Sequence, residues 1–397
     1  MTQLFIIADD FTGALDAAIP FGQAGIPAVV FRGAEVPWSS LPEDTQVVSV
    51  NIASRHLPPE QAGQLCADAA RDALAHGVPL LMKKTDSALR GNIGSELAAL
   101  MYSGGGHPLY FLPAFPAAGR TTCDGIQYWN GVPVAETAYG RDPFNPVMTS
   151  EVAAVIARQS ALPIQLLRPH DPIPAQTNTI YIADASEDAD LVRFCTGLPD
   201  QSQPLLLAGC AGLAAALAET WSGKPSRHQR ASIHHLLVVS GSLHPVSRSQ
   251  IRSAANSGIP LYTLNPSDED QSHLVTDVAE ALRASPIVLV ETTGNADVPG
   301  SPSDCSDRIA AAAAEILLHS GNDTALAVFG GDTLLSIASL YLQDGFHPES
   351  ELASGIPVTR AERKDGVPIT IVSKSGGFGA VDIVDQIADY FELRSTL

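Results

Sequence analysis

The residues best suited to chemistry lie at positions 83–94, where the sequence reads Lys-Lys-Thr-Asp-Ser-Ala-Leu-Arg-Gly-Asn-Ile-Gly. The apolar residues 78–82 before this stretch predict a buried strand, and residues 95–101 after it predict a helix. Ligands of open α/β sheets bind at the carboxyl ends of strands, and a helix start adds free backbone N–H groups. The basic side chains would attract an anion there, and Asp86 would accept a hydrogen bond from a hydroxyl. The alternative is that Asp86 and Ser87 only cap the helix.

A pair of acidic residues, Asp9 and Asp10, follows the first predicted strand at residues 4–8. Two neighbouring carboxylates repel each other unless a cation faces them. This arrangement suits a metal–phosphate or a hydroxyl that must lose its proton. The alternative is that one of the two residues merely caps the helix that starts after residue 10.

Basic residues follow two further predicted strands of the N-terminal half. Arg55 comes after the strand at residues 46–50, and Arg120 comes after the strand at residues 109–112. Strands that alternate with helices predict parallel βαβ units, whose strand ends share one edge of the sheet. We therefore expect these arginines near the acidic pair and near the 83–94 stretch.

Loops of small residues follow three predicted strands of the C-terminal half. Their sequences are Ser240-Gly241-Ser242, Gly330-Gly331-Asp332-Thr333 and Ser373-Lys374-Ser375-Gly376-Gly377-Phe378-Gly379. Small residues let the backbone approach a polyphosphate, and Lys374 adds a cation. Each loop alone could be an ordinary turn, but together they predict a nucleotide site. No GxGxxG follows the first strand of either half, which disfavours a dinucleotide.

The elements that must position these residues form two domains, which is the usual number for 397 residues. We predict an N-terminal domain at 1–220, a polar linker at 221–234 and a C-terminal domain at 235–397. Each would be an α/β domain with a mostly parallel sheet flanked by helices, and the active site would lie in the cleft between them. An Asn-Gly pair at 130–131 predicts a hairpin over residues 127–134.

Charge and composition exclude several classes of protein. The net charge of −20 argues against nucleic acid or an anionic membrane as a partner, because both need a basic surface. We also find no apolar run long enough to span a membrane and no signal peptide. The five cysteines are widely spaced, and histidines form no metal-binding pattern, so we expect reduced thiols, no protein metal site and a cytoplasmic location.

Taken together, these motifs resemble the four-carbon acid sugar kinase family, once catalogued only as a domain of unknown function. The resemblance covers both halves of the chain and is specific because the motifs occur jointly and in order. In the N-terminal half it rests on residues 8–14, 54–55, 84–91 and 119–121, and in the C-terminal half on residues 240–242, 330–333 and 374–379. One departure is Ala88, where family members often carry threonine. A second is His244, where a small polar residue is usual.

The resemblance implies an ATP-dependent kinase, with ATP and Mg²⁺ as cofactors, that phosphorylates the terminal hydroxyl of a four-carbon sugar acid. Residues 119–125, 134–137 and 141–147 look closest to the branch that converts D-threonate to 4-phospho-D-threonate; sister branches act on 3-oxo-tetronate, L-threonate or D-erythronate. A homodimer is a candidate assembly. The residues expected to contact the acid are Asp9, Arg55, Lys84, Thr85, Asp86, Ser87, Arg90 and Arg120. Those expected to contact ATP are Ser240, Ser242, Gly330, Gly331, Asp332, Thr333, Lys374, Gly376 and Gly377.

For catalysis we single out Lys84, which would neutralise charge, and Asp10 or Asp86, either of which could accept the proton of the hydroxyl. Two rival interpretations remain open. One is a non-catalytic sugar-acid sensor, which would not need the glycine loops of the C-terminal half. The other is an NAD-dependent sugar-acid dehydrogenase, which the missing GxGxxG disfavours.

Overall fold

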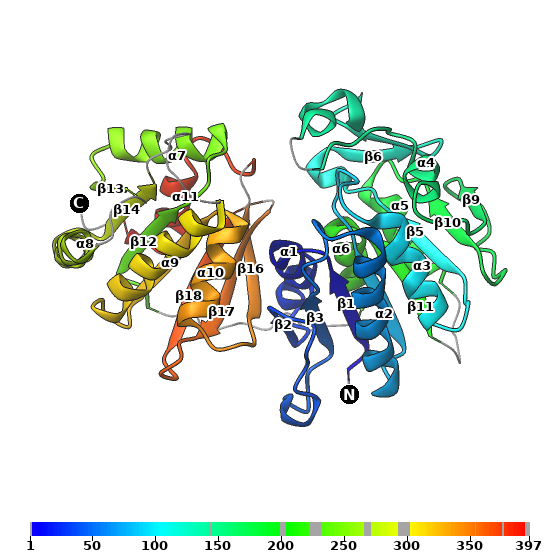
Figure 1. The fold of residues 1–397 in the computed structure, drawn as a ribbon, viewed down its shortest axis with the longest axis horizontal. Coiled ribbons are helices and arrows are strands. Elements are labelled where there is room, and N and C mark those ends of the chain that lie inside the picture. Colours follow the sequence, from blue (N-terminus) through cyan, green and yellow to red (C-terminus); the bar gives the residue numbers. More distant parts are fainter. Residues whose placement is uncertain are drawn as a thin grey trace. The chain divides into compact units, whose positions relative to one another are not determined.

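A computed structural model describes residues 2–142, 145–198, 204–221, 232–265, 271–292, 302–353, 355–374 and 377–393. The chain divides into two compact units, residues 1–226 and 227–397 (Figure 1). Each unit is built on a mostly parallel sheet with helices, so the predicted α/β class is confirmed. Most of the predicted linker, residues 222–231, lies outside the described residues. A site in a cleft between the units stays a prediction.

The N-terminal unit is centred on an eight-stranded sheet in the order β2-β3-β1-β4-β11-β5-β10-β9, in which neighbouring strands are parallel. Its strands are β1 (Leu4–Ala8), β2 (Ala28–Phe31), β3 (Val47–Asn51), β4 (Leu80–Lys84), β5 (Leu109–Leu112), β9 (Ile164–Leu167), β10 (Ile180–Ala183) and β11 (Leu205–Gly209). Its helices are α1 (Phe11–Gln23), α2 (Pro59–Ala75), α3 (Ile93–Ser103), α4 (Val152–Ala157), α5 (Asp188–Thr196) and α6 (Ala211–Thr220).

Both faces of this sheet are covered, so the central strands are apolar on both sides. In β1, Phe5 and Ile7 pack into one core with α2 and α3, whereas Leu4 and Ile6 pack into another with α1, α5 and α6. Alternation of side chains along a strand places successive residues on opposite faces. The two lysines that end β4 therefore point to different helix layers.

The strand β4 ends two residues later than the sequence predicted. The apolar run at 78–82 suggested that the lysines follow the strand, but Lys83 and Lys84 are its last two residues and are 0% and 5% exposed. Pairing with β1 on one side and β11 on the other extends the strand through both lysines. Backbone hydrogen bonds to both neighbouring strands thus keep Lys83 and Lys84 within β4 although their side chains are polar. Burial of the two ammonium groups is possible because each has a hydrogen-bond acceptor.

A small antiparallel sheet, β6-β7-β8, is inserted after β5, and it consists of β6 (Arg120–Cys123), β7 (Ile126–Trp129) and β8 (Val132–Pro133). The predicted hairpin is confirmed, since Asn130 and Gly131 both have positive φ in the turn between β7 and β8. The preceding strand β6 was not predicted. Short 3₁₀ turns at Pro116–Ala118, Val134–Glu136 and Ala138–Arg141 flank this sheet, and another lies at Trp38–Ser40.

The C-terminal unit contains a seven-stranded sheet in the order β13-β14-β12-β15-β18-β17-β16. Its strands are β12 (His235–Ser240), β13 (Leu261–Leu264), β14 (Ile287–Thr292), β15 (Thr324–Phe329), β16 (His347–Ala353), β17 (Ile356–Glu362) and β18 (Pro368–Lys374). Its helices are α7 (Pro245–Asn256), α8 (Ser272–Ala284), α9 (Pro302–Leu318), α10 (Gly331–Tyr341) and α11 (Ile383–Tyr390). The strand β17 is antiparallel to both of its neighbours, β16 and β18, and the other neighbouring strands pair in parallel.

The helices of this unit form two layers. Ile251 of α7 and Ile387 of α11 belong to a core with alternate residues of the central strands, and α8, α9 and α10 pack next to one another. Within the described residues, none of the helices is long and apolar enough to cross a membrane. The order β12-β15-β18 brings together the three strand ends that the sequence predicted to bind a nucleotide.

Candidate functional site

The N-terminal unit gathers its charged residues at the carboxyl ends of three adjacent strands. Asp9 and Asp10 follow β1, Arg55 follows β3, and Lys84 ends β4. The last residues of these strands are in register across the sheet. The predicted clustering at one edge is therefore found, and we call these residues with Thr85, Asp86 and Arg90 the strand-end cluster.

Arg55 holds the carboxylates of this cluster together. Its Nε donates to Asp9 Oδ2 at 2.7 Å, one terminal nitrogen donates to Asp10 Oδ2, and the other lies 3.8 Å from Asp86 Oδ1. Burial alone would raise the pKa of Asp9, but the charges of Arg55 and Lys83 outweigh it and lower that pKa. Asp9 therefore stays ionised although its side chain is 2% exposed.

Asp10 has two roles in this arrangement. Its Oδ1 accepts a hydrogen bond of 2.7 Å from the backbone N–H of Gly13 and so caps α1, while its Oδ2 contacts Arg55. Its side chain is 32% exposed, more than that of Asp9 or Asp86. The capping alternative raised from the sequence thus applies to Asp10, but capping leaves this carboxylate partly accessible.

Asp86 is almost fully occupied by donors. The guanidinium of Arg90 binds it through two parallel hydrogen bonds of 3.0 and 2.9 Å, and the N–H of Ala88 donates to it at 3.1 Å. A third nitrogen of Arg90 contacts Asp142 at 3.2 Å. Burial would raise the pKa of Asp86, yet Arg90 and Arg55 hold it well below its usual range. Arg90 therefore orients the ionised Asp86, and the guanidinium of Arg90 already contacts two carboxylates.

The two lysines at the end of β4 have contrasting partners. Lys83 Nζ lies 3.1 Å from Glu96 in α3, and Glu96 also accepts a hydrogen bond from the Ser54 hydroxyl. Burial would lower the pKa of Lys83, but the charge of Glu96 raises it. Lys84 Nζ donates to the backbone carbonyl of Thr85 at 2.9 Å. In the described part of the chain, no carboxylate lies within the 4.0 Å of an ion pair with Lys84.

Two further polar atoms of the cluster are buried and have no hydrogen-bond partner among the residues that the structure describes. They are Asp9 Oδ1 and Thr85 Oγ1, in residues that are 2% and 1% exposed. A buried polar atom without a partner costs free energy, which a bound ligand would recover. With the ammonium of Lys84, the cluster offers an acceptor, a hydroxyl and a cation, which suits a small acid that carries hydroxyl groups.

The remaining predicted contacts of the acid are Ser87 and Arg120. Ser87 is partly buried, and its carbonyl accepts a hydrogen bond of 3.1 Å from Gln127. Arg120 is not in a strand-exit loop as expected but begins β6, because its backbone pairs with Trp129. Its guanidinium is buried, donates to Tyr139 Oη at 2.8 Å, and lies 5.1 Å from the Trp129 ring.

The corresponding edge of the C-terminal unit is poor in charge and rich in close backbone contacts. Ser240, Phe329 and Lys374 end three adjacent parallel strands in the same register. The N–H of Ser242 donates to the Phe329 carbonyl at 3.1 Å, and the N–H of Gly330 donates to the Lys374 carbonyl at 2.9 Å. The three predicted loops therefore start from neighbouring strand ends, beside the start of α10, whose first backbone N–H groups have no acceptor within the helix.

Two glycines are required at this edge. Gly330 has φ of 126°, which other residues rarely adopt, and a Cβ on Gly241 would lie 2.1 Å from Thr333 Oγ1. Gly331 and Asp332 begin α10, and Asp332 is exposed. Gly376 lies outside the described residues. A Cβ on Gly377 would lie 3.7 Å from the ring of His244, so these two residues are neighbours.

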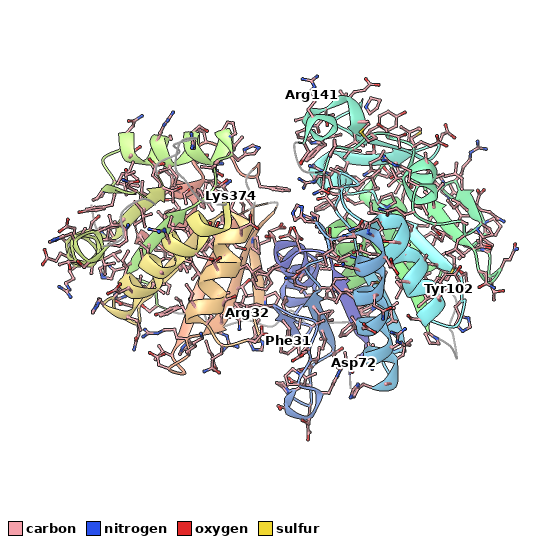
Figure 2. All side chains as sticks on the ribbon, viewed as in Figure 1. Phe31, Arg32, Asp72, Tyr102, Arg141 and Lys374 are labelled. Carbon is pink, nitrogen blue, oxygen red and sulfur yellow. The ribbon has the colours of Figure 1, made fainter. Side chains whose placement is uncertain are left out.

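Lys374 is the one predicted ATP contact that is a buried cation (Figure 2). It is 1% exposed, its Nζ donates to Ser247 Oγ at 3.0 Å, and it lies 5.0 Å from the ring centre of Phe329. Burial lowers its pKa from 10.5 to about 8. Burial and the charge of Lys374 also lower the pKa of His244, whose Nδ1 accepts from the N–H of Val246 at the start of α7.

Sequence reasoning missed several residues that support the cluster. Gln127 is fully buried and donates to the carbonyls of Ser87 and Pro113, so it joins two strand-end loops. Glu96 was assigned to a helix without a role, and Tyr139 lies against Arg90 as well as Arg120. A glutamate three residues after Ile93 in a mostly apolar helix was a signal, but nothing in the sequence pointed to Gln127.

These features define a class of two-unit α/β proteins that bind small ligands at the carboxyl ends of parallel strands. Family models match both units: a sugar-binding N-terminal domain matches residues 4–217, and a nucleotide-binding C-terminal domain matches residues 237–384. The chain therefore belongs to the family of proteins that contain this sugar-binding N-terminal domain. This is the family predicted from the sequence, so the resemblance is confirmed.

Curated relatives match almost the whole chain. A D-threonate kinase of Salmonella typhimurium is 28% identical, with 98% of this chain and 98% of the relative covered. A 3-oxo-tetronate kinase of Methylobacterium radiotolerans is 27% identical, with 96% and 98% covered. Among solved structures, a Salmonella typhimurium LT2 protein superposes with a TM-score of 0.78 at 22% identity, covering 98% of this chain and 100% of that one, which shows a common fold.

Proposed function

We propose that this protein is an ATP-dependent kinase that phosphorylates the terminal hydroxyl of a four-carbon sugar acid, with D-threonate as the preferred substrate. The observation that carries the proposal is the buried ammonium of Lys84, which has no carboxylate partner among the described residues and lies in a cluster of three aspartates. An unpaired buried cation is costly, and the carboxylate of a sugar acid would pair with it. The names of the relatives support the same substrate class.

The substrate would bind at the strand-end cluster. Lys84 binds the carboxylate, and the buried atoms Thr85 Oγ1 and Asp9 Oδ1 exchange hydrogen bonds with the hydroxyl groups of the acid. Arg55 and Arg90 hold the aspartates in place through the contacts described above. Ser87 and Arg120 would complete the walls of this site.

We assign proton abstraction to Asp10. Of the two candidates, Asp86 is bound by both ends of Arg90, and its low pKa makes it a weak base. The side chain of Asp10 is 32% exposed, and Asp10 follows β1, the strand next to β4 in the sheet. Asp10 accepts the proton of the substrate hydroxyl while the hydroxyl oxygen bonds to the γ-phosphorus of ATP. The bond between the γ-phosphorus and the oxygen that bridges it to the β-phosphate breaks, and ADP leaves.

The C-terminal unit would bind ATP. The close approach of Ser240–Ser242 to Gly330–Thr333, and the N-terminus of α10, provide backbone donors for phosphates. Lys374 adds a positive charge. Gly377 would line the same site. The residues present fit a nucleotide because Gly241 and Gly330 let the two loops pack closely beside the N-terminus of α10.

Phosphoryl transfer from ATP ordinarily requires Mg²⁺, which neutralises the charge of the phosphates. Within the described residues, no group of three or more His, Cys, Asp or Glu side chains is placed to hold a metal ion. We therefore propose that Mg²⁺ arrives with ATP and that Asp332, exposed in the first turn of α10, lies close enough to contact it.

The test is ADP release from ATP and Mg²⁺ with a panel of D-threonate, L-threonate, D-erythronate and 3-oxo-tetronate. We expect D-threonate to be turned over faster than the other acids. If another acid of the panel is preferred, the proposed substrate is wrong and the proposed kinase activity stands. If acids raise the thermal unfolding midpoint while ATP neither binds nor turns over, the protein is a sugar-acid sensor. A shift with NAD would instead favour the dehydrogenase.

A further inference from the structure

A pair of buried charges lies behind the strand-end cluster, and the reaction described above does not use it. Lys83, in β4, and Glu96, in the first turn of α3, are both fully buried. Lys83 Nζ lies 3.1 Å from Glu96 Oε2. Burial of two charges is costly, and apolar residues of similar size often stabilise a fold as well or better. Stability alone therefore gives no reason for a lysine and a glutamate at these positions.

Lys83 lies on the same face of the sheet as Asp9. It is paired with Ile7 of β1, and Ile7 and Leu81 both belong to the core that packs against α2 and α3. Side chains two positions apart along a strand point to the same face, so Lys83 shares the face of Leu81. Burial would lower the pKa of Lys83, and the charges of Glu96 and Asp9 raise it. The ammonium thus has two carboxylates in its surroundings.

Of these two carboxylates, Lys83 contacts only that of Glu96. Its Nζ pairs with Glu96 and donates to the Lys84 carbonyl at 2.8 Å. In the described part of the chain, Lys83 forms no ion pair with Asp9, since the two groups are farther apart than 4.0 Å. Arg55 holds Asp9 through Oδ2, and Asp9 Oδ1 is buried and has no hydrogen-bond partner among the described residues. An ammonium that could satisfy this oxygen is thus held toward α3.

Glu96 is itself fixed on the side of α3. Its Oε1 accepts a hydrogen bond from the buried hydroxyl of Ser54, while Oε2 faces Lys83. Ser54 is fixed in turn, because its N–H donates to the Asp9 carbonyl at 3.1 Å. Burial raises the pKa of Glu96, and the charge of Lys83 and the hydrogen bond from Ser54 act in the opposite direction. Both oxygens of Glu96 are therefore occupied by donors.

We propose that Glu96 is a positioning residue that holds the ammonium of Lys83 against α3 and thereby leaves Asp9 Oδ1 free to accept a hydrogen bond from a hydroxyl group of the substrate. Without the charge of Glu96, the ammonium would turn to Asp9, since a buried charge without a partner costs free energy. The free oxygen would then be lost to the substrate. The proposal rests on the proposed function and adds to it a residue outside the strand-end cluster.

The test removes the charge of Glu96 and then the ammonium that it holds. In Glu96→Gln, Lys83 pairs with Asp9, so the affinity for D-threonate, measured by calorimetry without nucleotide, should fall by about 10-fold or more. Lys83→Met/Glu96→Gln lacks the competing ammonium and keeps Arg55 beside Asp9, so its affinity should return to within about 3-fold of the wild type. Glu60→Gln, at an exposed glutamate in the first turn of α2, is the matched control.

Deoxy acids show whether the lost contact is that of Asp9 Oδ1. The 2-deoxy, 3-deoxy and 4-deoxy forms of the acid each lack one hydroxyl group. One of them should bind the wild type about 10-fold more weakly than D-threonate, because Asp9 Oδ1 is left without a donor. Glu96→Gln should bind that form and D-threonate about equally, since Lys83 already occupies the oxygen. A general loosening of the fold would weaken both ligands and keep the difference between them.

Two results would overturn the proposal. One is a folded Glu96→Gln protein that binds D-threonate as the wild type does. The other is a double variant, Lys83→Met/Glu96→Gln, that binds no better than Glu96→Gln. If Glu96→Gln does not fold, Glu96→Asp withdraws the carboxylate from Lys83 by one methylene group, and we expect a loss of about 3-fold that Lys83→Met reverses. Failure of that reversal would equally reject the proposal.

Unfolding equilibria test the same contact without a ligand, and they decide the case in which the wild type binds no four-carbon acid and the proposed function is wrong. The coupling between Asp9→Asn and Lys83→Met, measured by denaturant titration, should grow by about 10-fold in the unfolding constant when Glu96 is replaced by glutamine. An unchanged coupling would reject the positioning role of Glu96 as well. A larger coupling would keep that role, for a ligand of another class.

Discussion

The two units use the same edge of a parallel sheet in opposite ways. The N-terminal unit buries charged side chains there and binds them to one another, as Arg55 does with Asp9 and Asp10. The C-terminal unit presents backbone and glycine there, with Lys374 as its buried cation. Directional side chains select a small rigid ligand, whereas backbone donors suit a flexible polyphosphate. This contrast fits the division between acid and nucleotide that we propose.

The largest expected effect is the loss of the base. Asp10→Asn keeps an oxygen that can cap α1 but cannot take up a proton, so kcat should fall by about 10²- to 10⁴-fold. Affinity for both ligands should change little. Steady-state kinetics with calorimetry of each ligand measures this. If Asp10→Asn keeps its kcat while Asp86→Asn loses it, the assignment of the base is reversed.

Replacement of Lys84 should weaken binding of the acid and leave binding of ATP unchanged. Lys84→Met replaces the ammonium with a side chain of similar length, and we expect the affinity for the acid to fall by about 100-fold. The affinity for ATP should stay the same. Lys364→Met, at an exposed lysine, is the matched control. A variant that binds the acid within a factor of two of the wild type would contradict the role of Lys84.

Gly241→Ala makes the converse test in the C-terminal unit. The added methyl group would lie 2.1 Å from Thr333 Oγ1 and must displace it, so the affinity for ATP should fall by about 10-fold while acid binding is kept. Gly33→Ala is the control, because nothing lies within 4 Å of its Cβ. If a folded Gly241→Ala protein lost affinity for ATP and for the acid equally, the proposed assignment of one ligand to each unit would be wrong.

The smallest effect concerns pH and Lys374. Because the pKa of Lys374 is about 8, the charge that attracts ATP is lost as the pH rises from 7 to 9, and affinity should fall by a few-fold. Lys374→Arg should remove this dependence. Folding responds with the opposite sign: between pH 8 and 10.5 the unfolded chain binds more protons at this residue, so its contribution to the free energy of unfolding rises with pH. Calorimetry and denaturant titration across this range check both.

The sequence predicted the parts of the site that depend on strand order and on residue type. Asp9, Arg55 and Lys84 all follow or end apolar runs, and parallel topology brings such positions together. In the C-terminal unit the same argument located the three loops. These predictions worked because each residue's position is set by the strand next to it.

The partners of these residues were beyond the same reasoning. Whether Arg90 is available or bound to Asp86 and Asp142 depends on a contact across 52 positions of sequence. The role of Gln127 depends on a small sheet whose first strand, β6, has no apolar pattern. The two lysines of β4 looked equivalent in the sequence, and only the two helix layers distinguish them. The partners of these side chains are set by packing between segments far apart in the sequence, and the spacing of residues along the chain does not predict that packing.

The position of β11 has a consequence for how the protein is made. This strand is the last of its sheet in the sequence, yet it lies between β4 and β5 and pairs with both. The ribosome must therefore deliver residues 205–209 before the middle of the sheet can close, and earlier strands wait with unpaired edges. Such long-range pairing slows folding and exposes the chain to aggregation. We expect nascent chains that end before β11 to depend on chaperones and to lack affinity for the acid.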